Sequence, residues 1–209
     1  GCALGPNGGI AVDETMATSV PGIWAAGDAV EVRRIVDGRQ AWIALAGPAN
    51  KQGRVAGANA AGRHLRFRGA LGPSIVRVGA LPAANPGLSE RACAAAGIDC
   101  RAGWSRHLDH AGYFPGARPI DLKLVVDPRT GRLLGAQAVG ERGVDKRIDV
   151  LAAAIHAGMD VEDLEGLDLA YAPPYGAARD PIHHGAMALA NVHRGELSML
   201  ATEEARARL

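Results

Sequence analysis

Apolar and polar residues alternate over positions 120–126, in the second half of the chain. A period of two is typical of a strand with one buried face, so this segment predicts a β-strand. Positions 127–131 read DPRTG, a set of turn residues, and a mostly apolar segment follows at 133–139. The pattern therefore predicts an antiparallel hairpin.

The segment after the hairpin has the spacing of an amphipathic helix. Its apolar residues recur in three- and four-residue steps and share one face: Ile148, Leu151, Ala152 and Ile155. We expect Asp145 to cap the start of this helix and Gly158 to end it. Asp160 is expected to cap a further helix, with Glu162 and Asp163 in the first turn.

The first half of the chain has a different pattern. The short apolar runs at Ile10–Val12 and Ile23–Ala26 are bounded by Gly, Pro and Asp, as buried strands of an α/β sheet are. Pro48–Leu65 is rich in Ala and predicts a helix with Pro in its first turn. Gly53 and Gly57 within it each cost about 1 kcal/mol relative to Ala, which indicates close packing against this helix.

These patterns divide the chain into three parts. Residues 1–68 are expected to form an α/β fragment and residues 73–195 an α+β domain, with the sequence RGALGP joining them. Residues 196–209 are polar and helix-prone, and we expect a tail or linker there. The chain opens without Met, so we also expect that an earlier part of the protein precedes it.

Composition excludes several classes of protein. The net charge is +1 with no basic stripe, which argues against a nucleic-acid partner. No apolar run reaches the ~20 residues that a membrane helix needs. The three cysteines have no CxxC spacing, so neither a disulfide framework nor a zinc site is expected. A reducing, cytoplasmic setting fits these features.

The stretch at 18–30 reads TSVPGIWAAGDAV and places a Gly-Asp pair directly after an apolar run. In open α/β sheets, ligands bind beyond the carboxyl ends of strands. Gly27 would let a ligand approach the backbone, and the Asp28 carboxylate could accept hydrogen bonds from hydroxyls. Alternatively, Asp28 caps the next helix.

The whole stretch resembles the second FAD fingerprint of flavoproteins with two dinucleotide-binding domains. That resemblance implies that Asp28 binds the ribityl hydroxyls of FAD and that Gly27 lies close to them. It also implies that the residues around this pair contact the cofactor: Thr18, Pro21 and Ala26.

The helix that follows would aim its free N–H groups and positive dipole end at whatever lies before it. In the flavoproteins that the chain resembles, this is the electron-rich side of the isoalloxazine, where charge accumulates on reduction. Leu45, Ala46 and Gly47 are the residues implied at that position. The alternative is an Ala/Gly helix packed tightly on a sheet.

Four further strings occur in order: LAGPANKQGR, HAGYFPGA, GVDKRIDVLAAAI and LDLAYAPPYGAARDPI. With the FAD fingerprint, they resemble the branch of pyridine nucleotide–disulfide oxidoreductases that contains coenzyme A–disulfide reductases, NADH oxidases and persulfide reductases. The resemblance implies an α/β fragment of a FAD-binding fold, followed by an α+β dimerisation domain with an antiparallel sheet. It also implies a homodimer in which each C-terminal domain reaches the partner's active site.

By the same resemblance, Tyr171 lies near the partner's flavin and Tyr113 beside the partner's redox cysteine, where a phenol can stabilise a thiolate. Relatives often carry a Tyr-Tyr pair at the first position, whereas Phe114 stands second here, so only one hydroxyl is expected. Asn50 and Arg179 fall where relatives contact coenzyme A. The alternatives are interface packing for the tyrosines and a surface ion pair between Arg179 and Asp180.

Other polar residues have simpler interpretations. Lys146, Arg147 and Asp149 predict a solvated, salt-bridged face at a helix start. His107 and His110 flank Tyr113 and are expected to be exposed loop residues, although they could tune a thiolate. His183 and His184 are adjacent and cannot easily face one ion, so no metal site is expected.

Three parts of the implied reaction are missing from the chain. It has no GxGxxG loop for FAD or for NAD(P)H, and no cysteine in a redox-active context. The expected whole enzyme passes hydride from NADH or NADPH to FAD and then electrons to an upstream Cys, which reduces coenzyme A disulfide or persulfide. The alternatives are a water-forming NADH oxidase and a non-catalytic dimerisation module.

Overall fold

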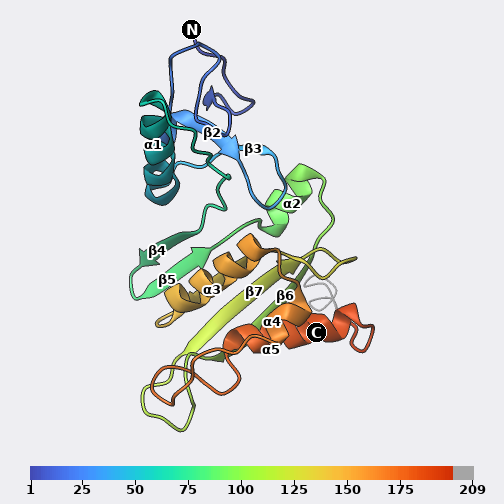
Figure 1. Ribbon diagram of the computed structural model, residues 1–209. Coiled ribbons are helices and arrows are strands. Elements are labelled where there is room, and N and C mark those ends of the chain that lie inside the picture. The colour runs from blue at the N-terminus through green and yellow to red at the C-terminus, as the bar shows by residue number, and fades with distance from the viewer. Residues whose placement is uncertain (200–209) are drawn as a thin grey trace. The chain divides into compact units, whose positions relative to one another are not determined.

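The computed structural model describes residues 1–199 and contains two compact units (Figure 1). The first unit is Gly1–Ser74, and the second begins at Ile75. Each has its own secondary structure and buried residues, so each is considered by itself.

The first unit is built on a small mixed sheet with the order β1-β2-β3. β1 (Ile10–Ala11) runs parallel to β2 (Val30–Arg33), and β3 (Gln40–Trp42) pairs antiparallel with β2. The 3-10 turn η1 (Gly27–Ala29) leads into β2, and α1 (Ala46–Ala60) follows β3. The core joins the sheet, the helix and the loops through six buried residues: Met16, Val30, Val32, Val55, Ala56 and Ala70.

Three expectations for this unit are wrong. Residues 23–26 form no strand, because only Trp24 makes an isolated bridge, to Ala17. The apolar run packs against the core by its side chains instead. The helix starts at Ala46 and ends at Ala60, well before Leu65. A Cβ added to either glycine inside it would meet nothing within 4 Å, so nothing described packs closely there.

Glu31 of β2 is a buried carboxylate, only 1% exposed, and it binds the N-terminal loop through hydrogen bonds. Its carboxylate accepts hydrogen bonds from the backbone N–H of Asn7 (2.7 Å), from the Asn7 side chain (2.8 Å) and from the N–H of Gly9 (2.9 Å). Burial by itself raises the pKa of Glu31, but the hydrogen bonds outweigh it and hold the pKa below its ordinary value. Gly5 is required nearby, because a Cβ there would lie 2.6 Å from the carboxyl carbon.

The second unit contains a five-stranded sheet with the order β4-β5-β8-β7-β6. The strands are β4 (Ser74–Val78), β5 (Leu81–Asn85), β6 (Arg101–Leu108), β7 (Pro119–Val126) and β8 (Leu133–Gly140). The predicted hairpin is confirmed as β7 paired antiparallel with β8. β5 and β6 also pair antiparallel with their neighbours, so the expected antiparallel sheet is present.

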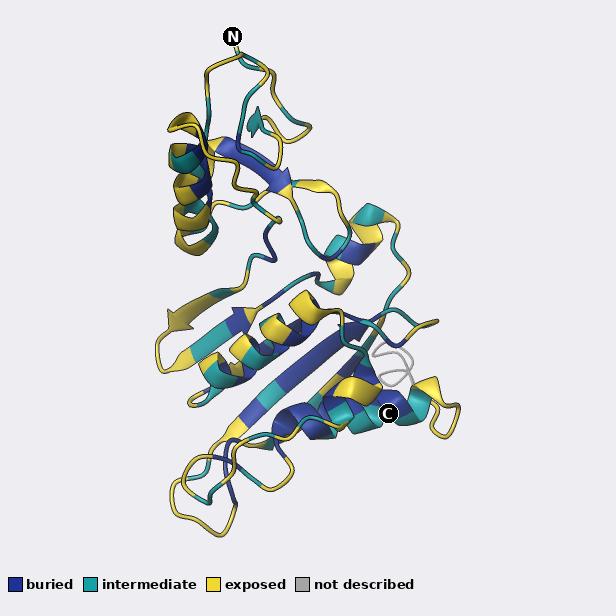
Figure 2. Ribbon diagram, viewed as in Figure 1, coloured by how far each residue is buried: buried dark blue, intermediate teal, exposed yellow. Residues whose placement is uncertain are grey.

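Helices α3 (Val144–Ala157) and α5 (Pro181–His193) both lie in front of this sheet in Figure 1. α3 packs on β5 and β8, and α5 packs on β6 and β7. The two central strands, β7 and β8, are accordingly mostly buried, as the dark β7 in Figure 2 shows. Two shorter helices complete the unit, α2 (Glu90–Ala96) and α4 (Val161–Glu165).

The helix ends follow the sequence with one exception. Gly158 ends α3 in the left-handed conformation, and Asp160 caps α4 in a capping box, as predicted. The N-cap of α3 is Gly143 rather than Asp145, which lies in the first turn, where its charge favours the helix dipole. Asp180 caps α5, and Pro181 follows as its first residue.

Two glycine-to-alanine substitutions should have opposite effects. A Cβ on Gly135 of β8 would lie 1.9 Å from the carbonyl oxygen of Leu88, so Gly135→Ala should lower the free energy of unfolding by about 2 kcal/mol or more. Gly57→Ala in α1 meets open space and should raise it by about 1 kcal/mol. Urea denaturation followed by circular dichroism measures both. A neutral Gly135→Ala variant would contradict the described packing.

Glu31→Gln should reduce the pH dependence of the first unit's stability. Because the folded-state pKa of Glu31 is lowered, its stabilisation is present above the unfolded-state pKa and is lost as pH falls through the folded-state value. Acid titration of the free energy of unfolding should therefore have a shallower slope in the variant. An unchanged slope would show that the Asn7 and Gly9 hydrogen bonds do not stabilise the carboxylate.

Candidate functional site

In the first unit, the Gly-Asp pair lies in η1, where the chain turns into β2. Gly27 has a φ of 84°, a conformation that favours glycine, and the preceding Ala26 is extended. Asp28 is exposed, and its carboxylate makes no hydrogen bond or ion pair with residues 1–199. Only its backbone oxygen is used, accepting from the Trp42 indole at 2.6 Å. The Asp28 carboxylate is therefore available to a ligand.

The start of α1 lies beside this turn. The N–H of Gly27 donates to Oε1 of Gln52 at 2.8 Å, and a Cβ on Gly27 would lie 3.9 Å from the Ala49 methyl. Leu45 precedes the helix in an extended conformation and supplies no capping side chain. Ala46 and Gly47 are exposed, so the positive end of the helix is open.

Gln52 was not predicted as a site residue. It is 1% exposed, and its Nε2 has no hydrogen-bond partner within the part of the chain that the structure describes. No sequence motif marks it, because Gln52 is one of several polar residues in the first two to three turns of the helix. Its contact with Gly27 depends on folding and is not visible from spacing.

Thr18 and Pro21 belong to the turn that precedes η1. The Thr18 hydroxyl accepts from the N–H of Val20 at 3.2 Å, and the backbone N–H of Thr18 donates to Ile23. Pro21 is exposed at the tip. These contacts shape the turn, and the structure leaves the outer surface of both residues accessible.

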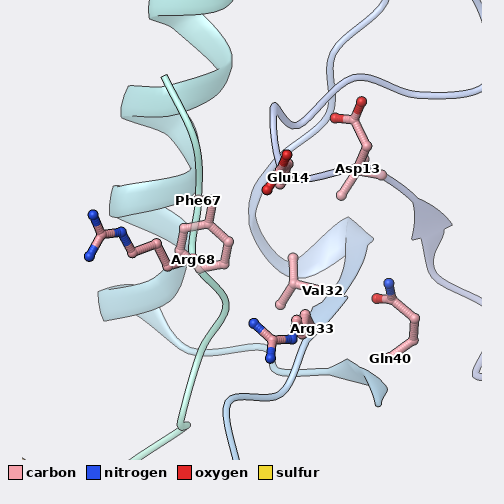
Figure 3. Close-up of a pocket in the computed structure, with 8 residues that line it drawn as sticks. Asp13, Glu14, Val32, Arg33, Gln40, Phe67 and Arg68 are labelled. Atoms are coloured by element: carbon pink, nitrogen blue, oxygen red, sulfur yellow. The ribbon is translucent and has the colours of Figure 1, made fainter. Parts of the chain in front are cut away.

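A separate pocket of about 360 Å³ lies in the same unit and is shown in Figure 3. Carboxylates and guanidinium groups line it together with apolar residues: Val12, Asp13, Glu14, Val32, Arg33, Gln40, Phe67 and Arg68. Asp13 accepts from the N–H and hydroxyl of Thr15 and from Ala17. These bonds overcome burial and lower the pKa of Asp13, so its role is to hold a turn. No predicted site residue lines this pocket.

In the second unit, Tyr113 and Tyr171 lie together, although 58 positions separate them in the chain. Their hydroxyl oxygens are 2.9 Å apart. The hydrogen bond shared with Tyr113, then burial and the Tyr113 charge, raise the pKa of Tyr171 above its ordinary value. Positions 113 and 114 carry one hydroxyl, as the sequence shows, and Tyr171 brings a second phenol beside it, while Phe114 packs edge-on against the His110 ring.

The tyrosines are carried by two loops, here named the Tyr113 loop (109–118) and the Tyr171 loop (167–180). Asp109 and Arg118 close the first loop through reciprocal bonds, N–H to carbonyl at 2.9 Å and N–H to carboxylate at 2.7 Å. The N–H of Ala111 donates to the carbonyl of Gly176 at 2.9 Å and ties the two loops together. Both phenols remain exposed, so the pair could reach another molecule.

The structure differs from the sequence analysis at three polar residues near these loops. Arg147 is not solvated but 1% exposed, and it forms an ion pair with Asp180 at 2.8 Å. Arg179 is exposed and makes no ion pair with Asp180 or with any other described residue, because Arg147 and the α5 cap occupy that carboxylate. His110 is also buried, and its Nδ1 lies 3.1 Å from Asp109.

Two of the histidines contact each other. His107 of β6 stacks on His184 of α5 with ring centroids 3.6 Å apart, and burial is the first cause that lowers the pKa of each. Among residues 1–199, no group of three or more His, Cys, Asp or Glu side chains could hold an ion. Asn50 of α1 is exposed in the first unit and Arg179 in the second.

Comparisons with known proteins identify the family. The model described as pyridine nucleotide-disulphide oxidoreductase, dimerisation domain, matches residues 74–181, and the model described as pyridine nucleotide-disulphide oxidoreductase matches residues 1–53. The chain therefore belongs to the pyridine nucleotide–disulphide oxidoreductases, a family of FAD-dependent enzymes. Within the described part of the chain, no helix has the length and apolar character needed to span a membrane.

Several relatives have related activities in their names. The chain is 43% identical to the CoA-dependent NAD(P)H sulfur oxidoreductase of Pyrococcus furiosus, over 87% of this chain and 41% of the relative. It is 32% identical to the coenzyme A disulfide reductase of Staphylococcus haemolyticus, over 87% and 41%. The reduced CoADR-RHD of Bacillus anthracis matches with a TM-score of 0.91 and 40% identity, over 95% of this chain and 36% of that one. The chain spans about two fifths of the curated relatives' length.

Tyr113→Phe should lower the pKa of Tyr171 toward that of a free phenol, because it removes the hydrogen bond that is the first cause of the shift. The chain has three tyrosines, so ¹³C labelling at the phenol carbon resolves each titration by NMR. Tyr175→Phe, in the same loop and 75% exposed, is the matched control and should leave Tyr171 unchanged. If the pKa of Tyr171 is the same in Tyr113→Phe as in the wild type, the pairing is disproved.

Proposed function

We propose that the complete protein is a FAD-dependent NAD(P)H:disulfide oxidoreductase that reduces coenzyme A disulfide or persulfide. The observation that carries the proposal is the pair of exposed phenols, Tyr113 and Tyr171, hydrogen-bonded at 2.9 Å in the family's dimerisation domain. Support comes from the relatives, whose names include coenzyme A disulfide reductase and CoA-dependent sulfur oxidoreductase.

The first unit fits FAD. The unpaired Asp28 carboxylate suits the ribityl hydroxyls, and the positive φ of Gly27 leaves the backbone open to close approach. The open start of α1 at Leu45, Ala46 and Gly47 suits an electron-rich ring edge. We also assign Thr18, Pro21 and Ala26 to this cofactor surface. When bound, FAD would accept hydride from NADH or NADPH.

Within a homodimer, we infer that the tyrosine pair faces the partner's redox cysteine. A phenol donates one hydrogen bond and accepts another, so one of the two can donate to its neighbour while the other donates to sulfur. A hydrogen bond to the thiolate that leaves a disulfide stabilises the developing negative charge. Tyr171 would also border the partner's flavin, as the family resemblance implies.

Asn50 and Arg179 are proposed as substrate contacts. Both are exposed, and Arg179 makes no ion pair within residues 1–199, so its guanidinium is free for a phosphate of coenzyme A. Arginine offers two parallel donors to a phosphate, whereas a lysine would offer a point charge.

The proposal assigns a domain to each part of the chain. Residues 1–68 would be the end of the FAD-binding domain, residues 73–195 the dimerisation domain and 196–209 a tail or linker, of which 200–209 lie outside the described residues. An N-terminal half would supply the phosphate loops and the redox cysteine. Among the described residues, Cys2, Cys93 and Cys100 form no disulfide, which suits a reducing cytoplasm.

The main alternative is an NADH oxidase, in which the cysteine becomes a sulfenic acid and oxygen is the acceptor. It is favoured by the NADH oxidase of Methanocaldococcus jannaschii, which is 33% identical to this chain over 40% of its own length. A stand-alone dimerisation module is the other alternative. A colourless full-length preparation would favour the module.

NADH and NADPH consumption by the full-length protein decides between these activities. Coenzyme A disulfide or persulfide should be reduced faster than oxygen, and Tyr113→Phe should slow disulfide reduction by about 100-fold, the lower range for a lost proton donor. Tyr175→Phe should retain the wild-type rate. Preference for oxygen would overturn the proposal.

A further inference from the structure

The contact between Tyr113 and Tyr171 requires that two separate loops keep a fixed position relative to each other. Both side chains are exposed, Tyr113 at 77% and Tyr171 at 45%, so packing around the rings cannot hold them. The constraint must therefore come from the loop ends and from the backbone hydrogen bond that joins the loops, Ala111 to Gly176.

One buried side chain reaches both loops. Arg147 projects from α3, and its Nε and Nη2 donate to the two carboxylate oxygens of Asp180 at 3.2 and 2.8 Å. Asp180 is the last residue of the Tyr171 loop and the cap of α5. Nη2 also donates to the backbone carbonyl of Asp109 at 2.6 Å, at the first residue of the Tyr113 loop.

The remaining nitrogen of the guanidinium, Nη1, also donates a hydrogen bond. Nη1 of Arg147 donates to the carbonyl of Gly143, at the start of the same helix, at 3.2 Å. A Cβ on Gly143 would lie 2.1 Å from Nη1, so the glycine leaves space for the Arg147 guanidinium. With every nitrogen bonded and the side chain buried, the guanidinium has one position, and it fixes both loop ends relative to α3.

Further hydrogen bonds hold the other ends of the two loops. The Asp109 carboxylate closes the Tyr113 loop at Arg118 and contacts His110. The other end of the Tyr171 loop is held at Leu167, whose carbonyl lies 2.8 Å from Nε2 of His183. The N–H of Asp180 donates to Nδ1 of the same ring, so Nε2 carries the proton and donates to Leu167.

We propose that Arg147 is a positioning residue that keeps the Tyr113 and Tyr171 hydroxyls within hydrogen-bonding distance by fixing one end of each loop. The use of that pair in disulfide reduction rests on the proposed function; the positioning itself does not. Lysine cannot replace Arg147 here, because an ammonium cannot span both carboxylate oxygens and the Asp109 carbonyl in one plane.

The test is the tyrosine titration by ¹³C NMR on the full 209-residue chain. In Arg147→Lys, which keeps a positive charge opposite Asp180, the pKa of Tyr171 should fall as it does in Tyr113→Phe. The double variant Arg147→Lys/Tyr113→Phe should show no further fall relative to Tyr113→Phe. Arg129→Lys, in the exposed turn between β7 and β8, is the matched control and should leave the titration unchanged.

Asp180→Asn provides a second measurement if Arg147→Lys does not fold, because it keeps an oxygen for the α5 cap but removes the charge that Arg147 pairs with. It should lower the pKa of Tyr171 as well. A folded variant of either kind that keeps the raised pKa of Tyr171 would overturn the positioning role.

Kinetics of the full-length protein separate this inference from the proposed function. If the pair acts at the partner's cysteine, Arg147→Lys should lower kcat for coenzyme A disulfide by about tenfold or more, with KM changed by less than about threefold. A fall in the pKa of Tyr171 with an unchanged kcat would support the positioning and contradict the catalytic use of the pair. A fall in kcat with an unchanged pKa would overturn the positioning.

Discussion

The buried ion pair between Arg147 and Asp180 is the constraint on which the second unit's candidate site depends. A charge removed from water must have a partner for each of its hydrogen-bonding groups, or folding is strongly opposed. Arg147 meets this requirement with groups from three segments, the start of α3 and one end of each tyrosine loop. The need to satisfy one cation therefore determines where two exposed loops lie, and the Tyr113–Tyr171 contact follows from it.

The candidate site of the first unit depends on open backbone and side-chain groups, whereas that of the second unit depends on a buried ion pair. Its candidate cofactor surface consists of a glycine in a positive-φ conformation, a free carboxylate and an uncapped helix start. Gln52 joins these parts by accepting from Gly27, and one amide hydrogen-bonding group is left without a partner among the described residues. An open helix end and an unpaired buried amide are features that a bound ligand can satisfy, and the chain alone does not.

The candidate site residues that sequence reasoning identified all lie within short motif strings. Gly27 and Asp28 share one string, and Tyr113 and Tyr171 each lie within a recognisable loop string, so local sequence is sufficient to single them out. Their supporting residues were missed or misinterpreted. The charged run that contains Arg147 predicts a solvated helix face, because the run says nothing about the loops that cover this side chain.

Sequence alone determined the features that depend on neighbouring residues: the β7–β8 hairpin from a period of two, the amphipathic face of α3, and the end of that helix at Gly158. Tertiary structure decided the rest. A strand as short as β3 carries no readable period and exists only because β2 supplies its hydrogen bonds. Whether a charge is solvated or buried, and which phenol pairs with which, depends on segments far apart in the chain, and only folding brings those together.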